Sequence, residues 1–395
     1  SWSFNYTGHS QNSMYRIVKH ISNTTLYAAT STVHDIYQST HLQDASLDAG
    51  SAGGKVVYSA DEGVTWQTLH DFGHPVFTVA IDPNNANRLY AGVVNHTQNA
   101  GGLWVSQNIN LGTASTWTQL SAPGRTEGHP HSIVILNDGT LVCTYTGRRN
   151  SSGVFTQSSG VFIYNPGLQV WSDKSDVGMF YWTRDLTIDP GDVNQNTWLV
   201  SVFSGWGGAP NGKGGLYRTT DRGNSWTKIC NLDRVASCTF NPANHDQVFI
   251  TTEGDGLWTS TDIHSATPTF QPVTSYPFYF PWKVFFNPYN TSEMWVSSFG
   301  NGIKTGSLIP MGLNEQGREQ KEVSIFPNPA SNVVIVKSPT ENTPERLEIY
   351  DSSGKKVIAV KQVSAIDVSE LASGNYVVKI LEKETISSGQ LVIRR

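Results

Sequence analysis

Short apolar runs separated by polar turns make up most of the first three-quarters of the chain. A typical unit begins with an apolar strand that ends in Asp-Pro or Asn-Pro. It continues with a strand centred on Tyr, Trp or Val, then a glycine turn and an aromatic strand. The Asp-Pro or Asn-Pro turn occurs at residues 82–83, 189–190, 241–242 and 287–288. Strand-length apolar runs bounded by turn residues predict β-strands.

The unit returns at intervals of about forty to fifty residues, and four short strands at such a spacing are typical of the blades of a β-propeller. Its first strand occurs six times, near residues 14–21, 75–81, 130–136, 182–188, 234–240 and 280–286. We therefore predict an all-β chain in which residues 1–308 form a six-bladed propeller with negligible helix. The last unit lacks its outer strand, whereas residues 1–6 have the pattern of an outer strand without a blade. Either the N-terminus completes the sixth blade, or blades upstream of residue 1 are missing and the propeller has seven.

A second motif marks the turn before the outer strand. Residues 59–66 read Ser-Ala-Asp-Glu-Gly-Val-Thr-Trp, residues 219–226 keep most of that pattern, and residues 106–108 and 260–262 are decayed copies. An Asp carboxylate can accept the turn amides, Gly allows the bend and Trp packs between sheets. Because this turn lies at the periphery of a blade, we predict that it is structural. It resembles the Asp-box of sialidases, xyloglucanase-type glycosidases and sortilin-like receptors, a motif that implies the fold and leaves the activity open.

The C-terminal part of the chain has a different pattern. Short β-branched runs at 332–336, 346–350 and 375–380 follow Phe-Pro-Asn-Pro at 326–329, a sequence that blocks helix. These runs predict a small immunoglobulin-like β-sandwich over residues 321–395, joined to the propeller by a linker at 309–320. The motif order, ending in Leu-Val-Ile-Arg-Arg, resembles the C-terminal sorting domain of type IX secretion cargo in Bacteroidetes. The resemblance implies a partner in the type IX secretion machinery and a secreted or cell-surface location, and it leaves open whether the domain is cleaved.

Composition agrees with an exported all-β protein. Only 15% of residues are charged, 11% are aromatic and 36 are Gly, which disfavours helices. No apolar run is long enough to span a membrane, and a net charge of −5 offers no basic surface to nucleic acid. The sequence begins without a signal peptide, so we expect the numbering to start at a mature or trimmed end. We expect a monomer.

The three cysteines, Cys143, Cys230 and Cys238, lack the spacing of a metal site, and we expect neither a metal nor a cofactor. Cys230 and Cys238 could form a disulfide in an oxidising compartment. Alternatively Cys238, which stands inside an apolar strand run, is a small buried filler.

Aligning the units on their Asp/Asn-Pro turns brings one residue of most blades to the rim of a central channel. These residues are His74, His129, Tyr181, Asp233 and Tyr279. Just inside the rim are Tyr15, Arg16, His131, Trp182, Arg184, Arg234, Trp282 and Lys283, and loops add Asp35, Glu127, Arg148, Trp206 and Glu253. Aromatic rings beside polar groups suit sugars, whose C–H faces stack while their hydroxyls form hydrogen bonds. We therefore predict an oligosaccharide or polysaccharide ligand.

The same residues could support catalysis. Glycoside hydrolysis needs two carboxyl groups, and the candidates are Asp35, Glu127, Asp233 and Glu253. We assign proton transfer to His129, His131 and Tyr181, and the clamping of an anion or hydroxyl to Arg16, Arg184 and Arg234. The remaining candidates, Tyr15, His74, Arg148, Trp182, Trp206, Tyr279, Trp282 and Lys283, are predicted to bind substrate. We favour hydrolysis of a plant or algal polysaccharide over lyase chemistry.

Two alternatives stay open. Residues 14–18 resemble the Arg-Ile-Pro strand of sialidases, with Val18 in place of Pro. That resemblance implies a sialidase-like exo-glycosidase in which Arg16 and two other arginines, from among Arg148, Arg184 and Arg234, hold a carboxylate. The other alternative is a non-catalytic surface propeller that binds glycan or protein, because no sequence motif pairs two of the carboxylates.

Overall fold

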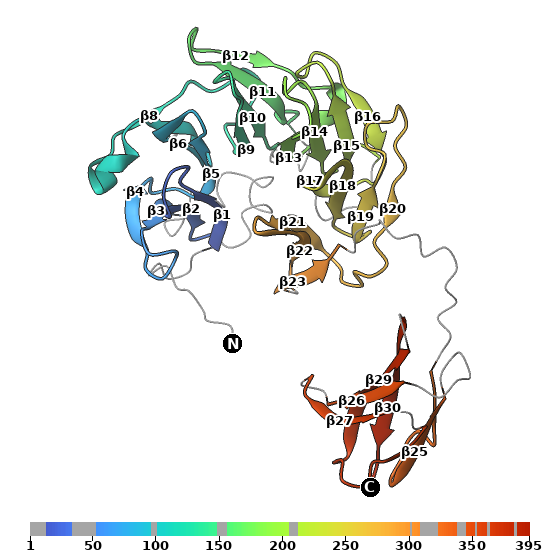
Figure 1. Cartoon of the computed structure of the whole chain (residues 1–395). Coiled ribbons are helices and arrows are strands. Elements are labelled where there is room, and N and C mark those ends of the chain that lie inside the picture. The colour runs from blue at the N-terminus through green and yellow to red at the C-terminus, as the bar shows by residue number, and fades with distance from the viewer. Residues whose placement is uncertain are drawn as a thin grey trace. The chain divides into compact units, whose positions relative to one another are not determined.

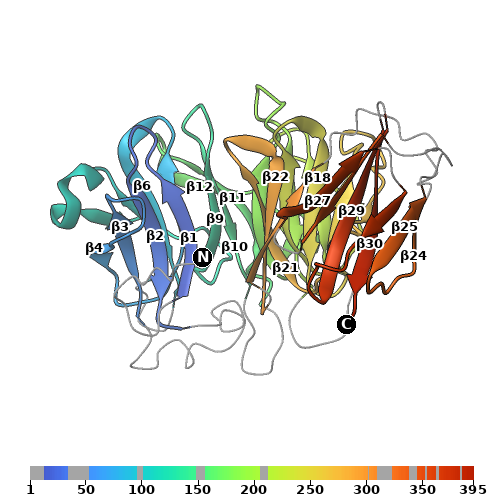
Figure 2. The ribbon, with the colours of Figure 1, turned by 60° about the horizontal axis from the view of Figure 1, so that its bottom comes forward.

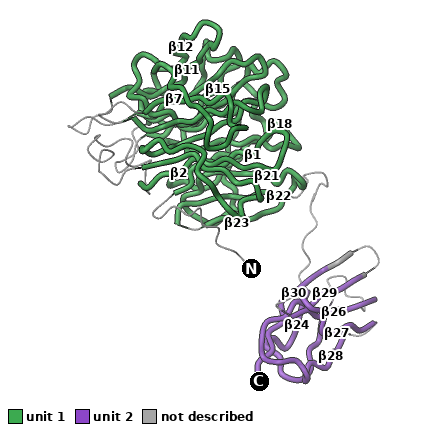
Figure 3. The backbone as a smooth tube through the Cα atoms, turned by 90° about the vertical axis from the view of Figure 1, so that its left-hand side faces the viewer, with its two compact units in different colours: residues 1–309 green, residues 310–395 purple. Residues whose placement is uncertain are grey.

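The computed structural model describes residues 13–33, 53–95, 101–147, 156–204, 212–300, 302–308, 323–337, 345–351, 354–361, 364–382 and 385–395. The chain divides into two compact units, Ser1–Ile309 and Pro310–Arg395 (Figure 3). In the described part of the chain, helix is limited to two short 3-10 turns, η2 (Ile109–Ala114) and η3 (Val177–Met179).

The described residues of the first unit form six antiparallel sheets that follow one another along the chain, five of four strands and one of three. The first three sheets are β1 (Ser13–Lys19), β2 (Leu26–Ser31), β3 (Lys55–Ser59) and β4 (Gln67–Asp71); β5 (Val76–Asp82), β6 (Asn85–Val93), β7 (Gly102–Ser106) and β8 (Trp117–Gln119); and β9 (Pro130–Ile135), β10 (Leu141–Tyr145), β11 (Gly160–Asn165) and β12 (Val170–Asp173). The other three are β13 (Thr183–Ile188), β14 (Trp198–Val202), β15 (Gly215–Thr219) and β16 (Thr227–Cys230); β17 (Val235–Asn241), β18 (Asn244–Thr252), β19 (Leu257–Ser260) and β20 (Gln271–Pro272); and β21 (Pro281–Asn287), β22 (Asn290–Ser298) and β23 (Gly302–Ser307).

The sheets are arranged as the blades of a propeller. The first strands β1, β5, β9, β13, β17 and β21 contact one another in that order and stand innermost around a common axis (Figure 1). Figure 2 shows strands of neighbouring blades standing side by side. The second strands pack on both faces, so they read as continuous apolar runs: every residue of β14, Trp-Leu-Val-Ser-Val, is buried. Burying each such side chain contributes about 1.5–3 kcal/mol.

Packing between blades, rather than within them, builds the core. One apolar cluster joins Val56 of the first blade to Leu89 of the second, and another joins Leu199 of the fourth to Phe240 of the fifth. The three cysteines are buried with free thiols, and Cys238 packs in the second of these clusters. The interpretation of Cys238 as a buried filler is therefore supported over a disulfide with Cys230.

The Asp-box turns hold the outer strands. Asp61 accepts the Thr65 N–H at 2.8 Å and the Thr65 hydroxyl at 2.5 Å, and these bonds, together with one from Ser59, lower its pKa to about 2. Asp221 makes the same bonds with Ser225, and its pKa is also about 2. The two decayed copies keep the arrangement, since Asn108 and Asp262 each accept a threonine N–H at 2.9 Å. Their partners lie farther along the chain, because the turns are longer.

Each first strand carries a β-bulge at the same end. The register shifts fall between Met14 and Arg16, Val76 and Thr78, Thr183 and Leu186, Val235 and Ser237, and Pro281 and Lys283, with the corresponding shift of the third blade at Pro130 to Ser132. The residues inside the shifts are Tyr15, Phe77, His131, Arg184 with Asp185, Ala236 and Trp282. A bulge bends its strand and redirects side chains. Most of the predicted inner-rim residues therefore lie at or beside a bulge.

The second unit contains two sheets that share one apolar core. The first is formed by β24 (Ser324–Phe326), β25 (Val333–Lys337) and β28 (Ala365–Asp367). The second is formed by β27 (Lys356–Lys361), β26 (Arg346–Tyr350), β29 (Gly374–Glu382) and β30 (Thr385–Ile393). Val334 and Val336 of the first sheet pack with Ile349, Val378 and Leu391 of the second.

Candidate functional site

An ion cluster links three blades at the axis of the propeller. The buried carboxylate of Asp185, on β13, accepts a hydrogen bond from Lys283 Nζ on β21, and its Oδ1 lies 4.0 Å from Arg16 Nη1 on β1. Side-chain exposure is 5% for Asp185, 35% for Arg16 and 23% for Lys283. Burying a carboxylate is costly unless it is paired, and the contacts with Lys283 and Arg16 offset that cost.

Asp185 is a residue that the sequence analysis missed. It stands at the position of its strand that Arg16 and Lys283 occupy in theirs, directly after the bulge residue. Aligning the blades on their Asp/Asn-Pro turns therefore contained the signal for this contact. The alignment could not show that these three positions lie close together across the axis.

Arg184, the neighbouring residue, is buried among aromatic rings. Its guanidinium carbon lies 4.0 Å from the centre of the Trp282 ring and 5.1 Å from the centres of the Trp182 and Phe203 rings. Each such contact stabilises the cation by roughly 0.5–2 kcal/mol. The faces of the two predicted sugar-stacking tryptophans are thus turned to a cation of the protein, and Trp182 itself is fully buried.

The histidine pair lies below the surface of the same region. His131 is buried and packs against Phe77, with ring centroids 5.8 Å apart. Burial, together with the positive charges of Arg184, Arg16 and Lys283, holds the pKa of His131 well below its usual value, so the imidazole is neutral. His129 is fully buried, and its Nδ1 accepts the Asn95 N–H at 3.2 Å.

Two other predicted groups pair with each other. The Arg234 guanidinium donates to Glu253 Oε2 at 2.6 Å, and both side chains are largely buried. Asp233 accepts the Gly214 N–H at 2.9 Å and thereby fixes the start of β15. These two carboxylates are therefore engaged within the protein.

The remaining described candidates are spread over the rim. Tyr15 donates to the Val33 carbonyl at 3.2 Å, and Lys213 Nζ lies 4.9 Å from the centre of the Tyr181 ring. His74 and Glu127 are half-buried. Asp35, Arg148 and Trp206 lie outside the described residues.

Exposed aromatic side chains cluster on the rim of the sixth blade. Tyr279 is 67% exposed and Phe299 is 62% exposed. Phe280, which directly follows Tyr279, has a positive φ of 56°. The Phe299 N–H donates to the Phe280 carbonyl at 3.0 Å, so the two loops are in contact. Phe280 and Phe299 are absent from the sequence-based candidates, although Tyr-Pro-Phe-Tyr-Phe-Pro-Trp at 276–282 is a strong aromatic signal.

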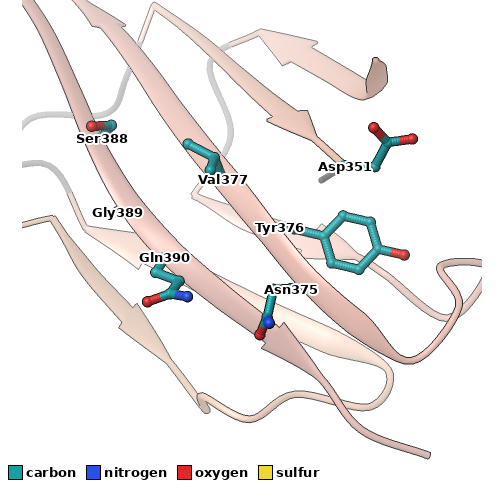
Figure 4. Close-up of a pocket in the computed structure, with 7 residues that line it drawn as sticks. All are labelled: Asp351, Asn375, Tyr376, Val377, Ser388, Gly389 and Gln390. Atoms are coloured by element: carbon teal, nitrogen blue, oxygen red, sulfur yellow. The ribbon is translucent and has the colours of Figure 1, made fainter. Parts of the chain in front are cut away.

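Two hollows are present in the described surface. One, of about 350 Å³, lies along β13, β17 and β21 and is lined by Lys283 together with Thr187, Thr239 and Phe285. The other, of about 390 Å³, is in the second unit and is lined by Asp351, Asn375, Tyr376, Val377, Ser388, Gly389 and Gln390 (Figure 4). Only the first contains a predicted site residue. In the described residues no three His, Cys, Asp or Glu side chains are grouped to bind a metal, and no helix is long and apolar enough to span a membrane.

Comparison with known proteins decides the role of the second unit. Residues 324–394 match the family of secretion system C-terminal sorting domains. The chain carries a C-terminal sorting domain for type IX secretion. The sorting domain directs the protein to the cell surface or beyond, and the predicted partner and location are thereby confirmed.

The propeller has more distant relatives. A xyloglucanase from Paenibacillus sp is 25% identical over 198 residues, which cover 44% of this chain and 18% of the enzyme. The extracellular domain of a hybrid two-component system from B. thetaiotaomicron has a TM-score of 0.52 at 12% identity, covering 95% of this chain and 46% of that one. The extracellular domain of a one-component system from the same organism has a TM-score of 0.50 at 13% identity, covering 98% and 51%. The chain thus spans less than a fifth of the enzyme and about half of the structural relatives, and the latter establish the fold alone.

Proposed function

We propose that this exported protein is a saccharide-binding propeller of six blades, followed by an immunoglobulin-like sorting sandwich. The observation that carries the proposal is the exposed aromatic group of the sixth blade, Tyr279, Phe280 and Phe299, beside the axial ion cluster. Phe280 and Lys283 are three residues apart, so the aromatic loop leads directly into the cluster. Aromatic rings give a sugar its stacking surface, and charged side chains bind its hydroxyls.

Backbone strain supports a functional role for this loop. A positive φ is costly for a bulky residue such as Phe, of order 1–3 kcal/mol, and such strain concentrates at ligand sites. At Phe280 the strained conformation presents an aromatic ring to solvent instead of burying it. A purely structural loop would gain nothing from that exposure.

Binding is favoured over catalysis because the described carboxylates have other partners. Glycoside hydrolysis requires two carboxyl groups on opposite sides of the scissile bond. Glu253 pairs with Arg234, Asp233 holds a backbone amide and Asp185 holds two cations. We therefore infer a non-catalytic role for these three.

A polysaccharide hydrolase is the second candidate function. The similarity to a xyloglucanase favours it. Its carboxyl groups would then be Asp35 and Glu127. The lyase and sialidase alternatives have less support, because Arg184 and Arg234, two of the proposed clamps, contact aromatic rings and Glu253 respectively.

The proposal includes closure of the ring by residues 2–6. The sixth blade has three described strands, and its side chains Trp295 and Ile303 are exposed, although they belong to strands of a blade. Residues 2–6 alternate Trp, Phe and Tyr with polar residues, as a strand covering such a face must.

The test is a binding and turnover screen on the full-length chain. Plant and algal oligosaccharides are titrated by calorimetry, and prolonged incubations are assayed for reducing ends and for the absorbance of new double bonds. We expect saturable binding without product, weakened about tenfold or more by Tyr279→Ala, since one lost stacking contact is worth about 1–2 kcal/mol. The matched control is Tyr289→Ala, a 91% exposed tyrosine in the turn at the other end of the same blade.

Three outcomes decide the question. Equal weakening by both tyrosine variants, or no binding to any saccharide, would refute the proposal. Product formation abolished by Asp35→Asn or Glu127→Gln would establish the hydrolase instead.

A further inference from the structure

The axial cluster carries more positive than negative charge. Arg16, Arg184 and Lys283 are cations, Asp185 is the one carboxylate that the described residues place among them, and His131 is neutral. The nearby Arg234–Glu253 pair adds no net charge. One carboxylate cannot neutralise three cations, so the field at the axis attracts anions even though the chain as a whole is acidic at −5.

The geometry leaves hydrogen-bond donors available on two of the cations. Arg16 lies 4.0 Å from Asp185, beyond hydrogen-bond distance, and its guanidinium makes no side-chain hydrogen bond to the described residues. A guanidinium has five N–H donors and an ammonium three, and Lys283 directs one of its donors to Asp185. Both side chains are partly exposed, whereas the carboxylate between them is not. A ligand therefore reaches the donors without meeting the carboxylate.

The hollow beside Lys283 has the lining of a sugar site. Its volume of about 350 Å³ lies at the lower end of the range of about 300–1,000 Å³ for small-molecule sites. Thr187 and Thr239 contribute hydroxyls, of which that of Thr239 also donates to the Val284 carbonyl at 3.0 Å, and the half-exposed ring of Phe285 contributes an apolar surface. Lys283 places a positive charge at its edge.

We propose that the axial site recognises a sugar that bears an anionic group, a carboxylate or a sulfate ester. The anionic group bridges Arg16 and Lys283, and the sugar ring extends along the hollow. Asp185 keeps the two cations at the axis and limits their affinity for simple salts. This inference rests on the proposed saccharide-binding function and adds the chemical class of the ligand.

Matched pairs of ligands test the class. Trigalacturonate is compared with its methyl ester, and a sulfated galactan oligosaccharide with its desulfated form, by calorimetry on the full-length chain at low and at moderate salt. We expect the charged member of at least one pair to bind about tenfold or more tightly, because charge-assisted hydrogen bonds contribute about 1.5–3 kcal/mol. The advantage should shrink as salt screens the charges. The pair that shows it identifies carboxylate or sulfate.

Substitutions with opposite expected effects test the site. Lys283→Gln and Arg16→Gln should each remove most of the preference for the charged ligand over its neutral counterpart. Asp185→Asn should strengthen binding of the charged ligand, since it removes the competing carboxylate. Lys304→Gln is the control, because this lysine of the same blade lies over the Phe278 ring at 4.7 Å and belongs to no axial contact.

The outcomes distinguish failure of this inference from failure of the proposed saccharide-binding function. Equal binding of charged and neutral ligands refutes the inference and leaves saccharide binding intact, whereas no binding of either refutes both. A charge preference that survives Lys283→Gln and Arg16→Gln places the anion elsewhere and also refutes it. The Arg16 side chain is partly exposed and its guanidinium makes no hydrogen bond to the described residues, so Arg16→Gln provides a test even if Asp185→Asn fails to fold.

Discussion

The imidazole of His264 holds the fourth and fifth blades together, and its removal should destabilise the propeller in a pH-dependent way. His264 Nε2 lies 2.6 Å from Asp189 in the turn after β13, and Nδ1 lies 2.7 Å from Asp246 on β18. Burial lowers the pKa of His264, but the hydrogen bonds to Asp246 and Asp189 outweigh it, and the net pKa is raised. Both bonds are charge-assisted when the ring is protonated.

The exposure of the two carboxylates sets how much each hydrogen bond of His264 contributes to stability. The Asp189 side chain is 5% exposed, so its bond contributes about 1.5–3 kcal/mol, whereas Asp246 is 65% exposed and contributes about 0–1 kcal/mol. His264→Gln should therefore cost about 2 kcal/mol when the ring is charged. A neutral imidazole donates one hydrogen bond only, so the cost should fall to about 1 kcal/mol at high pH.

The sign of the pH dependence is fixed by linkage. A folded-state pKa above the unfolded value gives stability that is complete below about pH 6.5 and is lost as pH rises through the folded pKa. The difference in the free energy of unfolding between wild type and His264→Gln should thus be largest near pH 6 and decrease toward pH 9. At about 2 °C per kcal/mol for a unit of this size, the melting temperature should drop by about 4 °C at pH 6.

Tryptophan fluorescence is the appropriate assay, because all 12 tryptophans precede residue 309 and report on the first unit alone. His70→Gln provides a control of opposite sign. Burial lowers the pKa of His70, so any stability that this ring contributes should be present above about pH 6.5 and lost at lower pH. If the stability difference between wild type and His264→Gln is constant from pH 5 to 9, or is largest at pH 9, the reasoning is refuted.

Three further predictions concern other parts of the chain. Asp61→Asn should lower the melting temperature without changing saccharide binding, and the loss should disappear as pH falls from about 4 toward the Asp61 pKa of about 2, measured by thermal melts across that range. The three buried thiols should be inert to a thiol reagent in the native protein and all react after denaturation; prompt reaction in the native state would contradict their burial. Deleting residues 1–12 should lower the fluorescence-detected melting temperature and increase dye binding to the exposed apolar side chains of the sixth blade, and an unchanged melt would argue against ring closure by the N-terminus.

Much of the fold was readable because each blade repeats one pattern. The Asp/Asn-Pro turns and the strands around them fixed the phase of the repeat, so the six first strands were located to within a few residues. The decayed Asp-boxes were harder to interpret. Asn108 reaches a threonine eight residues on and Asp262 one seven residues on, whereas Asp61 reaches one four residues on. A longer turn can close on the same oxygen, and a fixed-spacing motif does not detect it.

The candidate site was only partly readable, because burial at the axis depends on several blades at once. Trp182 and Phe280 have corresponding places in their repeats, yet Trp182 is fully buried and Phe280 is 40% exposed. The difference comes from Arg184 and Phe203, which cover Trp182 through contacts that no local pattern encodes. The same holds for Asp185, whose partners are 169 residues before it in β1 and 98 residues after it in β21.

Hydroxyl groups of one blade stabilise the bulges of the next. The geometry of the site therefore depends on neighbouring blades. Thr144, Ser201 and Thr251, each on a second strand, donate to the carbonyls of Arg184, Ala236 and Trp282, the bulge residues of the following blades, at 2.6, 3.2 and 2.9 Å. A bulge removes a carbonyl from its own ladder, and a buried carbonyl without a partner costs about 1–3 kcal/mol. The preceding blade supplies that partner, so the conformation of these three bulges depends on the neighbouring blade. Arg184 and Trp282 are therefore positioned by contacts between blades, and a single blade in isolation could not present them as the propeller does.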